Sequence, residues 1–170
     1  MLEQRKFAGA RDLLERAVAV TIKNRSSTND YLALLYANLG LAERGLGQAS
    51  KARVLLEKAL RVAEVTRHRN LGPILAELAD IACVEKRTRE GLAFLDRAGP
   101  VTRTADPDDP WRIAWLDNIR GACVAAGRPA EGRALLLASM APLRERWPAG
   151  TLFRVTAEQR LAVQHVVDNR

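Results

Sequence analysis

The feature that most limits how this chain can fold is a set of small residues and leucines that recurs every 39 to 41 residues. A small residue lets two helices approach closely, and a leucine beside it fills the remaining space. A period of roughly 20 to 50 residues is typical of folds in which each repeat buries its apolar face against the next one. The corresponding residues are Leu39, Gly40, Ala52, Leu56 and Ala59 in the first copy, Leu78, Ala79, Gly91, Leu95 and Ala98 in the second, and Ile119, Arg120, Gly132, Leu136 and Ser139 in the third.

Within each copy, apolar residues follow a spacing of three and four residues, which is the period of a helix. No stretch alternates with period two for long enough to indicate a strand, so the sequence predicts an all-α protein. Turn signals such as Gly47, Gly127 and Pro148 separate the helices, and the short connections favour antiparallel pairs. The predicted helices cover residues 2–24, 30–46, 49–67, 71–86, 89–99, 110–126, 129–146 and 151–168.

At these positions the sequence resembles the tetratricopeptide repeat (TPR) family. The matching residues are Tyr36, Leu39, Gly40, Ala52, Leu56 and Ala59. The longer spacing is similar to the kinesin-light-chain variety, which also occurs in tails of bacterial kinases and regulators. The resemblance implies a TPR-like α-solenoid, a right-handed superhelix of antiparallel helix pairs. As a single domain over 1–170, it would hold full repeats at 30–67, 71–99 and 110–146.

Some positions depart from the family pattern. Arg120 stands where the other copies have small residues, so we expect the third repeat to splay. The aromatic residue usual late in the first helix is replaced by Glu43, Ala82 or Cys123.

The two end segments have no pairing helix of their own. Residues 1–24 match the second helix of a repeat whose first helix is missing, which predicts a fragment or tail of a longer protein. This orphan helix is expected to pair with another copy of the chain or to be the least stable unit. Residues 151–168 are expected to cap the stack with a polar outer face.

The charge balance leaves one alternative function open. The chain carries 27 Lys and Arg against 20 Asp and Glu, a net charge of +7. The basic residues are scattered, and many fall at predicted helix ends, where they face the negative end of the helix dipole. Aromatic residues rarely accompany them. A nucleic-acid-binding helical array is therefore the alternative to a protein-binding one.

Catalytic and metal-binding patterns are weak. Only His68 and His165 could serve as histidine bases, and neither has an identifiable partner, so we expect no enzyme and no cofactor. Cys83 and Cys123 lack zinc-site spacing and are interpreted as small buried residues. The carboxylates of residues 106–109 are interpreted as a helix start rather than a metal site. With no apolar span of about 20 residues and no secretory signal, the chain is expected to be cytoplasmic.

What remains is recognition of a protein or peptide, so we expect a protein-protein interaction module. The resemblance to tails of bacterial kinases and regulators implies that it is part of a larger bacterial regulatory protein. The resemblance implies a concave groove lined by first helices. Asn38 and Asn118 would either hold the backbone of an extended peptide or tie neighbouring helices together, and both interpretations remain open. The lining carries three carboxylates, which favours basic or apolar ligand side chains. The predicted groove residues are Leu34, Ala37, Asn38, Leu41, Glu77, Asp80, Asp117 and Asn118.

Overall fold

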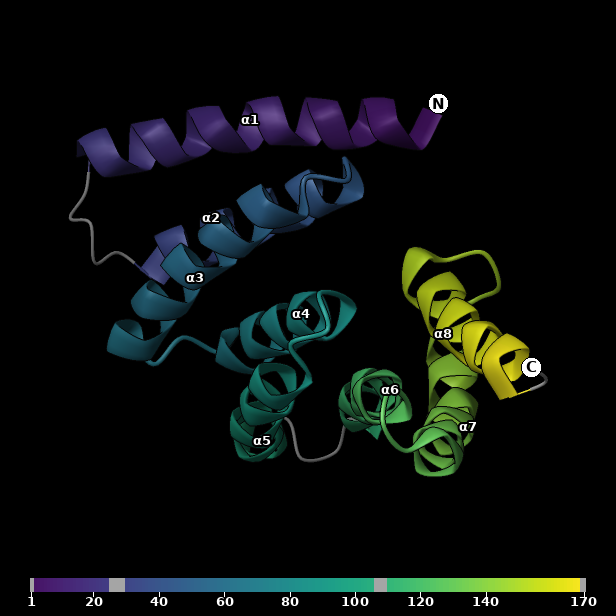
Figure 1. Ribbon diagram of the computed structural model, residues 1–170. Coiled ribbons are helices and arrows are strands. Elements are labelled where there is room, and N and C mark those ends of the chain that lie inside the picture. Colours follow the sequence, from purple (N-terminus) through teal and green to yellow (C-terminus); the bar gives the residue numbers. More distant parts are fainter. Residues whose placement is uncertain (1, 25–29, 106–109, 169–170) are drawn as a thin grey trace. The chain divides into compact units, whose positions relative to one another are not determined.

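A computed structural model describes residues 2–24, 30–105 and 110–168 (Figure 1). Its described residues form helices joined by short turns, and none of them lies in a strand. The predicted all-α fold is confirmed for the described residues. No described helix is both long and apolar enough to cross a membrane. The helices are α1 (Leu2–Asn24), α2 (Asp30–Gly45), α3 (Ala49–Thr66), α4 (Leu71–Val84), α5 (Thr88–Ala105), α6 (Pro110–Ala125), α7 (Pro129–Arg146) and α8 (Leu152–Asp168).

Helix α5 runs past the point where the sequence predicts its end. The prediction ends this helix at residue 99 because proline lacks the N–H that continues a helix, but α5 includes Pro100 and extends to Ala105. Gly99 precedes the proline and has no Cβ to clash with the pyrrolidine ring, which removes part of the steric objection. The hydroxyl of Thr104 donates a hydrogen bond to the carbonyl of Pro100 at 2.9 Å.

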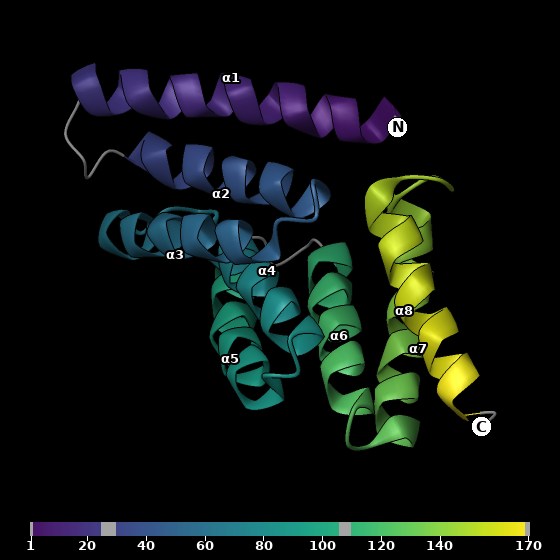
Figure 2. The ribbon, with the colours of Figure 1, turned by 45° about the horizontal axis from the view of Figure 1, so that its top comes forward.

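The chain divides into two compact units, Met1–Leu78 and Ala79–Arg170, and each is described by itself. In the first unit α2 lies between α1 and α3 (Figure 2). Gly45 permits the contact with α1, because a Cβ there would lie 2.6 Å from the ring of Phe7. Gly40 permits the contact with α3, where Ala52 and Leu56 are fully buried. The predicted close contact at Ala52 is therefore present.

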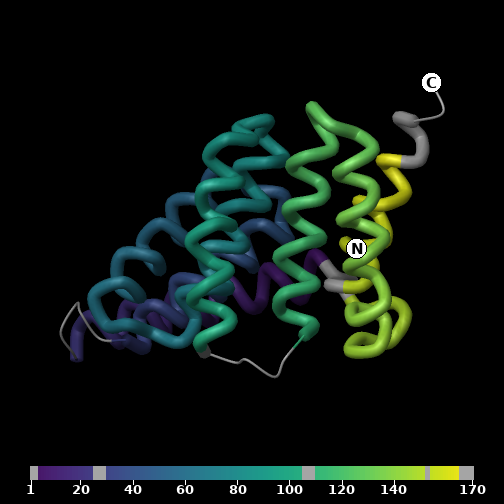
Figure 3. The backbone as a smooth tube through the Cα atoms, turned by 90° about the horizontal axis from the view of Figure 1, so that it is seen from below, coloured from purple at the N-terminus to yellow at the C-terminus, as the bar shows by residue number. Residues whose placement is uncertain are grey.

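In the second unit α6 and α7 pack side by side and α8 covers both (Figure 3). Leu95, Ile119, Leu136 and Leu143 form its fully buried core. The predicted close contact at Gly132 is also present, since a Cβ there would lie 2.5 Å from the backbone nitrogen of Ala125.

The register of the third repeat differs from the prediction by one residue. Gly121, rather than Arg120, takes the place of Gly40. A Cβ at Gly121 would lie 2.9 Å from the backbone oxygen of Gly132. A Cβ at Gly40 would lie 3.2 Å from the equivalent oxygen of Ala52. With a small residue at the contact, the third repeat packs closely and does not splay.

The hydrogen bond that closes the turn explains this shift. The turns after α2 and α4 each contain a residue with left-handed backbone, Gly47 at φ 78° and Lys86 at φ 61°. Their helices end with a hydrogen bond that spans five residues, from Gln48 N–H to Glu43 C=O and from Arg87 N–H to Ala82 C=O. Residues 126–128 have no positive φ, and the corresponding bond from Arg128 N–H to Val124 C=O spans only four residues.

Cys83 and Cys123 form a disulfide, with Cα atoms 5.1 Å apart. The expectation of two separate buried residues is wrong. Their separation of 40 residues is close to the repeat spacing, so the repeat brings them to similar heights on α4 and α6. The period itself was the signal that could have predicted the pair.

Candidate partner-binding surfaces

In the first unit, α2 presents a face with three of the predicted groove residues. Leu34, Ala37 and Leu41 are spaced three and four residues apart, which places them on one side of a helix. Leu34 and Leu41 are partly exposed, and Ala37 is nearly buried. Asn38 lies at the edge of this face with its side chain exposed. The face therefore combines apolar surface with one accessible amide.

The first predicted carboxylate is already paired. Glu77, on the part of α4 that belongs to the first unit, accepts a short hydrogen bond from Arg44 of α2. Glu77 is buried and Arg44 is partly exposed. This ion pair ties α2 to α4.

In the second unit, Arg160 of α8 reaches two of the predicted groove residues. Its Nη2 lies 2.6 Å from Oδ1 of Asp80, and its Nη1 donates to Oδ1 of Asn118 at 2.8 Å. The guanidinium also lies over the ring of Trp115, 4.8 Å from its centre. The side chains of Asp80 and Arg160 are only 3% and 11% exposed. The carboxylate of Asp80, which the sequence predicts to contact a ligand, is therefore already paired with Arg160 of the protein itself.

The amide nitrogen of Asn118 forms a hydrogen bond with α7. Its Nδ2 donates to Ser139 Oγ at 3.0 Å, and Ser139 in turn donates to the carbonyl of Leu136 at 2.7 Å. Asn118 is 0% exposed and bridges α6, α7 and α8. With the corrected register it corresponds to Ala37 rather than to Asn38. Of the two interpretations of this asparagine, the observed contacts match the one in which it ties helices together.

Asp117 lies apart from this network, in a hollow of about 250 Å³ between α5 and α6. Partial burial raises the pKa of the Asp117 carboxyl, and the nearby guanidinium groups of Arg120 and Arg103 oppose the rise. Arg120 itself pairs with Asp96 of α5 at 2.7 Å. The hollow is lined by balanced charges.

The predicted groove residues are therefore only partly brought together. Leu34, Ala37 and Leu41 share a face, and Asp80 and Asn118 meet through Arg160. The sequence did not predict that Arg160 pairs with Asp80 or that Arg44 pairs with Glu77. No local signal identifies them, because each lies 33 to 80 residues from the group it pairs with.

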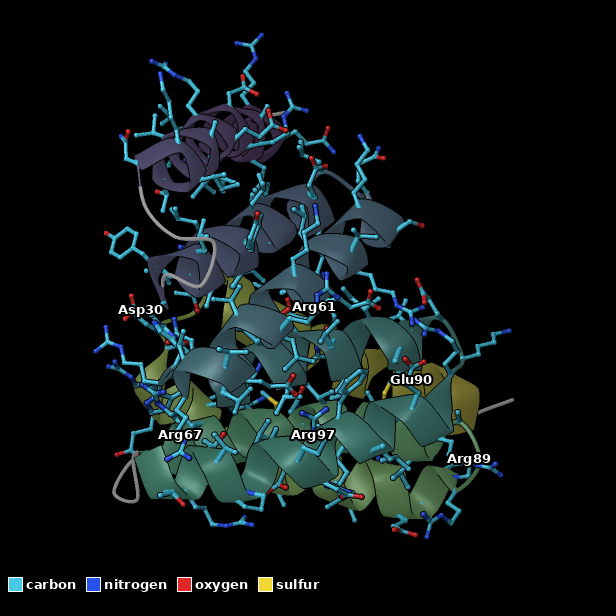
Figure 4. The ribbon with its side chains drawn as sticks, turned by 90° about the vertical axis from the view of Figure 1, so that its left-hand side faces the viewer. Asp30, Arg61, Arg67, Arg89, Glu90 and Arg97 are labelled. Atoms are coloured by element: carbon cyan, nitrogen blue, oxygen red, sulfur yellow. A yellow bond between two sulfur atoms is a disulfide. The ribbon has the colours of Figure 1, made fainter. Side chains whose placement is uncertain are left out.

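The basic residues are used in a similar way elsewhere. Pairs with carboxylates include Arg53 with Glu57 at 2.9 Å and Arg154 with Glu158 at 3.0 Å. Exposed arginines remain in each unit, such as Arg61 of α3 and Arg89 of α5 (Figure 4). Arginines in each unit are thus held in internal ion pairs, while the net charge of +7 is unchanged by them.

Neither catalytic nor metal-binding geometry is visible in the described ranges. The ring of His68 accepts a hydrogen bond from the backbone N–H of Asn70 at 3.1 Å, a local turn contact. No group of three or more His, Cys, Asp or Glu in the described part could hold a metal ion. The side chain of His165 and residues 106–109 lie outside the described residues.

Comparison with known proteins supports the repeat assignment. The tetratricopeptide repeat family matches this chain over residues 1–64. No curated protein sequence matches it. The crystal structure of nearly identical TPR-like repeats from a Podosopora anserina protein, assigned as a kinesin light chain, has a TM-score of 0.67 at 21% identity. That alignment covers 98% of this chain and 82% of the other chain.

A variant of the same Podosopora anserina repeats gives a TM-score of 0.67 at 21% identity, covering 98% of this chain and 81% of that chain. At this identity the likeness concerns the fold. It confirms the predicted TPR-like α-solenoid fold, and the family match over residues 1–64 confirms the predicted resemblance to tetratricopeptide repeats.

Proposed function

Because residues 1–64 are tetratricopeptide repeat sequence and the whole chain has the fold of such repeats, we propose that this protein binds a partner protein or peptide. TPR repeats are in general protein-interaction modules rather than catalysts. The proposed contact surface begins on α2, with Leu34 and Leu41 as apolar contacts and Asn38 as a hydrogen-bonding group.

The observation that carries the proposal is the state of Asn38. Its amide is exposed between two partly exposed leucines. Among the described residues it makes no side-chain hydrogen bond. An amide both donates and accepts hydrogen bonds, so it can pair with the backbone of an extended segment. Partly exposed leucines beside it supply the apolar area that such an interface needs.

The internal ion pairs modify the ligand chemistry expected from the sequence. Glu77 and Asp80 are neutralised by Arg44 and Arg160, so the groove does not depend on a basic ligand. We propose a segment with apolar side chains that offers backbone groups to Asn38. The same pairings occupy Arg44 and Arg160, so these two arginines do not support the alternative function, a nucleic-acid-binding array.

The context of this activity is also a proposal. The resemblance to tails of bacterial kinases and regulators supports a role as the partner-docking part of a larger bacterial regulatory protein in the cytoplasm. The Cys83–Cys123 pair makes the location testable, because the cytosol keeps such pairs reduced. Recovery of the pair as a disulfide from rapidly alkylated cells would contradict a cytoplasmic location.

Self-association through α1 is a separate part of the proposal. Leu13 and Val20 of this helix are 66% and 58% exposed and lie seven residues apart, on one face. If a second copy covers this face, the Leu13→Glu variant will sediment as a monomer while the parent chain sediments as a dimer. A parent chain that is monomeric at every concentration would contradict it.

The experiment that tests the binding function compares surface variants. Capture from lysate of the source cells would identify the partner, and titration calorimetry would then measure its affinity. We expect Leu41→Glu and Asn38→Ala to weaken binding about tenfold or more, because a desolvated contact at an interface centre is typically worth over 1 kcal/mol. Val65→Glu is the matched control, since Val65 is 71% exposed on α3. Unchanged affinity in Asn38→Ala with intact helicity would contradict the groove assignment.

A further inference from the structure

A second cleft of the first unit lies on the other side of α2. It is lined by Leu39 and Glu43 of α2, by Glu15 of α1, and by Ser50, Lys51, Val54 and Leu55 of α3. Its volume is about 490 Å³, within the range of roughly 300 to 1,000 Å³ that ligand pockets occupy. Leu39 and Glu43 are four residues apart on one face of α2. At 100° per residue, that face is opposite to the one that carries Leu34 and Leu41.

One residue that lines the cleft departs from the repeat pattern. Glu43 stands where the TPR pattern usually has an aromatic side chain late in the first helix. A flat ring there would fill the space between the two flanking helices. The carboxylate of Glu43 is smaller and leaves the space open, with the apolar side chains of Leu39, Val54 and Leu55 around it.

One oxygen of the Glu43 carboxylate is buried without a hydrogen-bond partner. The residue is only 4% exposed, and its Oε2 has no hydrogen-bond donor within reach. A buried charged acceptor that lacks a donor costs free energy, so such an atom is rarely retained without a use. Glu15 brings a second carboxylate to the rim of the same cleft.

The nearby cations do not satisfy this atom. Lys51 lines the cleft but its side chain is exposed, and it makes no ion pair with Glu43. Arg11 of α1 is close enough to act electrostatically on Glu43, but its guanidinium is held by Asp12 at 2.8 Å. The cleft therefore combines apolar walls with an excess of unpaired negative charge at its floor and rim.

We propose that this cleft binds a lysine side chain of a partner protein. The four-carbon stem would pack on Val54, Leu55 and Leu39, and the ammonium group would donate to the carboxylates of Glu43 and Glu15. An ammonium group has three donors that can reach separate carboxylates. A guanidinium group is suited to two oxygens of one carboxylate, whereas the two acceptors here belong to different side chains. The site is distinct from the α2 face of the proposed groove.

The test uses the full chain and a capped amino acid as the probe. N-acetyl-lysine N-methylamide is titrated into the methyl-labelled protein, and N-acetyl-norleucine N-methylamide serves as the uncharged probe of similar length. We expect saturable shifts of the Val54 and Leu55 methyl signals with the lysine probe, and at least tenfold weaker response to the norleucine probe. Equal responses to both probes would overturn the proposal, as would tighter binding of the capped arginine.

Variants keep the test independent of folding. Glu43→Gln is expected to abolish the response to lysine, whereas Glu57→Gln, at a partly exposed residue of α3 that pairs with Arg53 outside the cleft, leaves it unchanged. Glu43→Met is expected to raise the melting temperature of the free protein, because an apolar side chain removes the unpaired buried charge. A lower melting temperature of Glu43→Met would show that the carboxylate has an internal partner and would overturn the proposal.

Lys51 provides the last control. Lys51→Ala is expected to leave the melting temperature unchanged and to strengthen the response to the lysine probe, since a competing positive charge is removed. Loss of stability in Lys51→Ala would identify Lys51 as the occupant of the cleft and would overturn the proposal. None of these measurements depends on the variants that test the α2 groove, so the two proposals fail separately.

Discussion

Replacing Arg160 by methionine is expected to destabilise the second unit by about 3–5 kcal/mol. The substitution leaves the carboxylate of Asp80, which is 3% exposed, without its cation. It also removes the donor to Asn118 Oδ1. Breaking a buried pair by removing one partner strands the other charge in a medium of low dielectric constant, which accounts for this magnitude. At roughly 2–4 °C per kcal/mol for a chain of this length, the melting temperature should fall by about 6–20 °C.

A double-mutant cycle separates the pair from its surroundings. Asp80→Leu alone strands the guanidinium, whereas Asp80→Leu with Arg160→Met replaces both charges by apolar groups of similar volume. We expect the double variant to be more stable than either single variant by about 2 kcal/mol or more. Arg128→Met is the matched control, because Arg128 and Glu131 form an exposed pair whose loss should cost under about 1 kcal/mol.

The tryptophans make the assay specific for the second unit. All three, Trp111, Trp115 and Trp147, lie in Ala79–Arg170. Urea denaturation followed by tryptophan fluorescence thus reports on this unit, while circular dichroism reports on all helices. Additive effects in the double variant, or a loss below about 1 kcal/mol in Arg160→Met, would refute the reasoning that the buried charges depend on each other.

Three further predictions follow from individual contacts. Gly121→Ala should lower the free energy of unfolding by about 1–3 kcal/mol through overpacking, and Arg120→Ala should lower it by under about 1 kcal/mol. Urea denaturation measures both. A larger loss in Arg120→Ala than in Gly121→Ala would support the register predicted from the sequence. Cys83→Ser should lower the stability of the oxidised protein by up to about 4 kcal/mol for a closed loop of 40 residues and should make it insensitive to dithiothreitol. Because burial raises the pKa of Asp117, its charged form opposes folding. Asp117→Asn should therefore stabilise the protein at pH 7, and this gain in stability should shrink as the pH falls through the raised pKa. A gain in stability that stays constant across pH would contradict this prediction.

Local patterns in the sequence were sufficient for the helices and for most of the close contacts. The three- and four-residue spacing of apolar side chains reflects burial on one side of a helix, which is a property of neighbouring residues. Small residues such as Ala52 and Gly132 mark contacts because no larger side chain fits there. Both features recur in each repeat of the sequence and can be recognised without knowing which helices are in contact.

The register of the two helices joined by the turn after α6 could not be predicted from such local patterns. The closing hydrogen bond of this turn spans one residue fewer without any change in residue type that a pattern would detect, since Gly127 occupies the turn as Gly47 does in the first repeat. A single offset for both helices of the third repeat therefore aligns Arg120 with Gly40 and Asn118 with Asn38.

The polar contacts depend on positions that are far apart in the chain. Asp80, Asn118 and Arg160 meet only when α4, α6 and α8 stand side by side, and nothing near any of them in sequence selects the others. Likewise, the unpaired state of Glu43 follows from which side chains of α1 and α3 surround it. Helical periodicity depends on each residue's nearest neighbours along the chain, whereas the pairing of a buried charge depends on the three-dimensional packing that brings distant segments together.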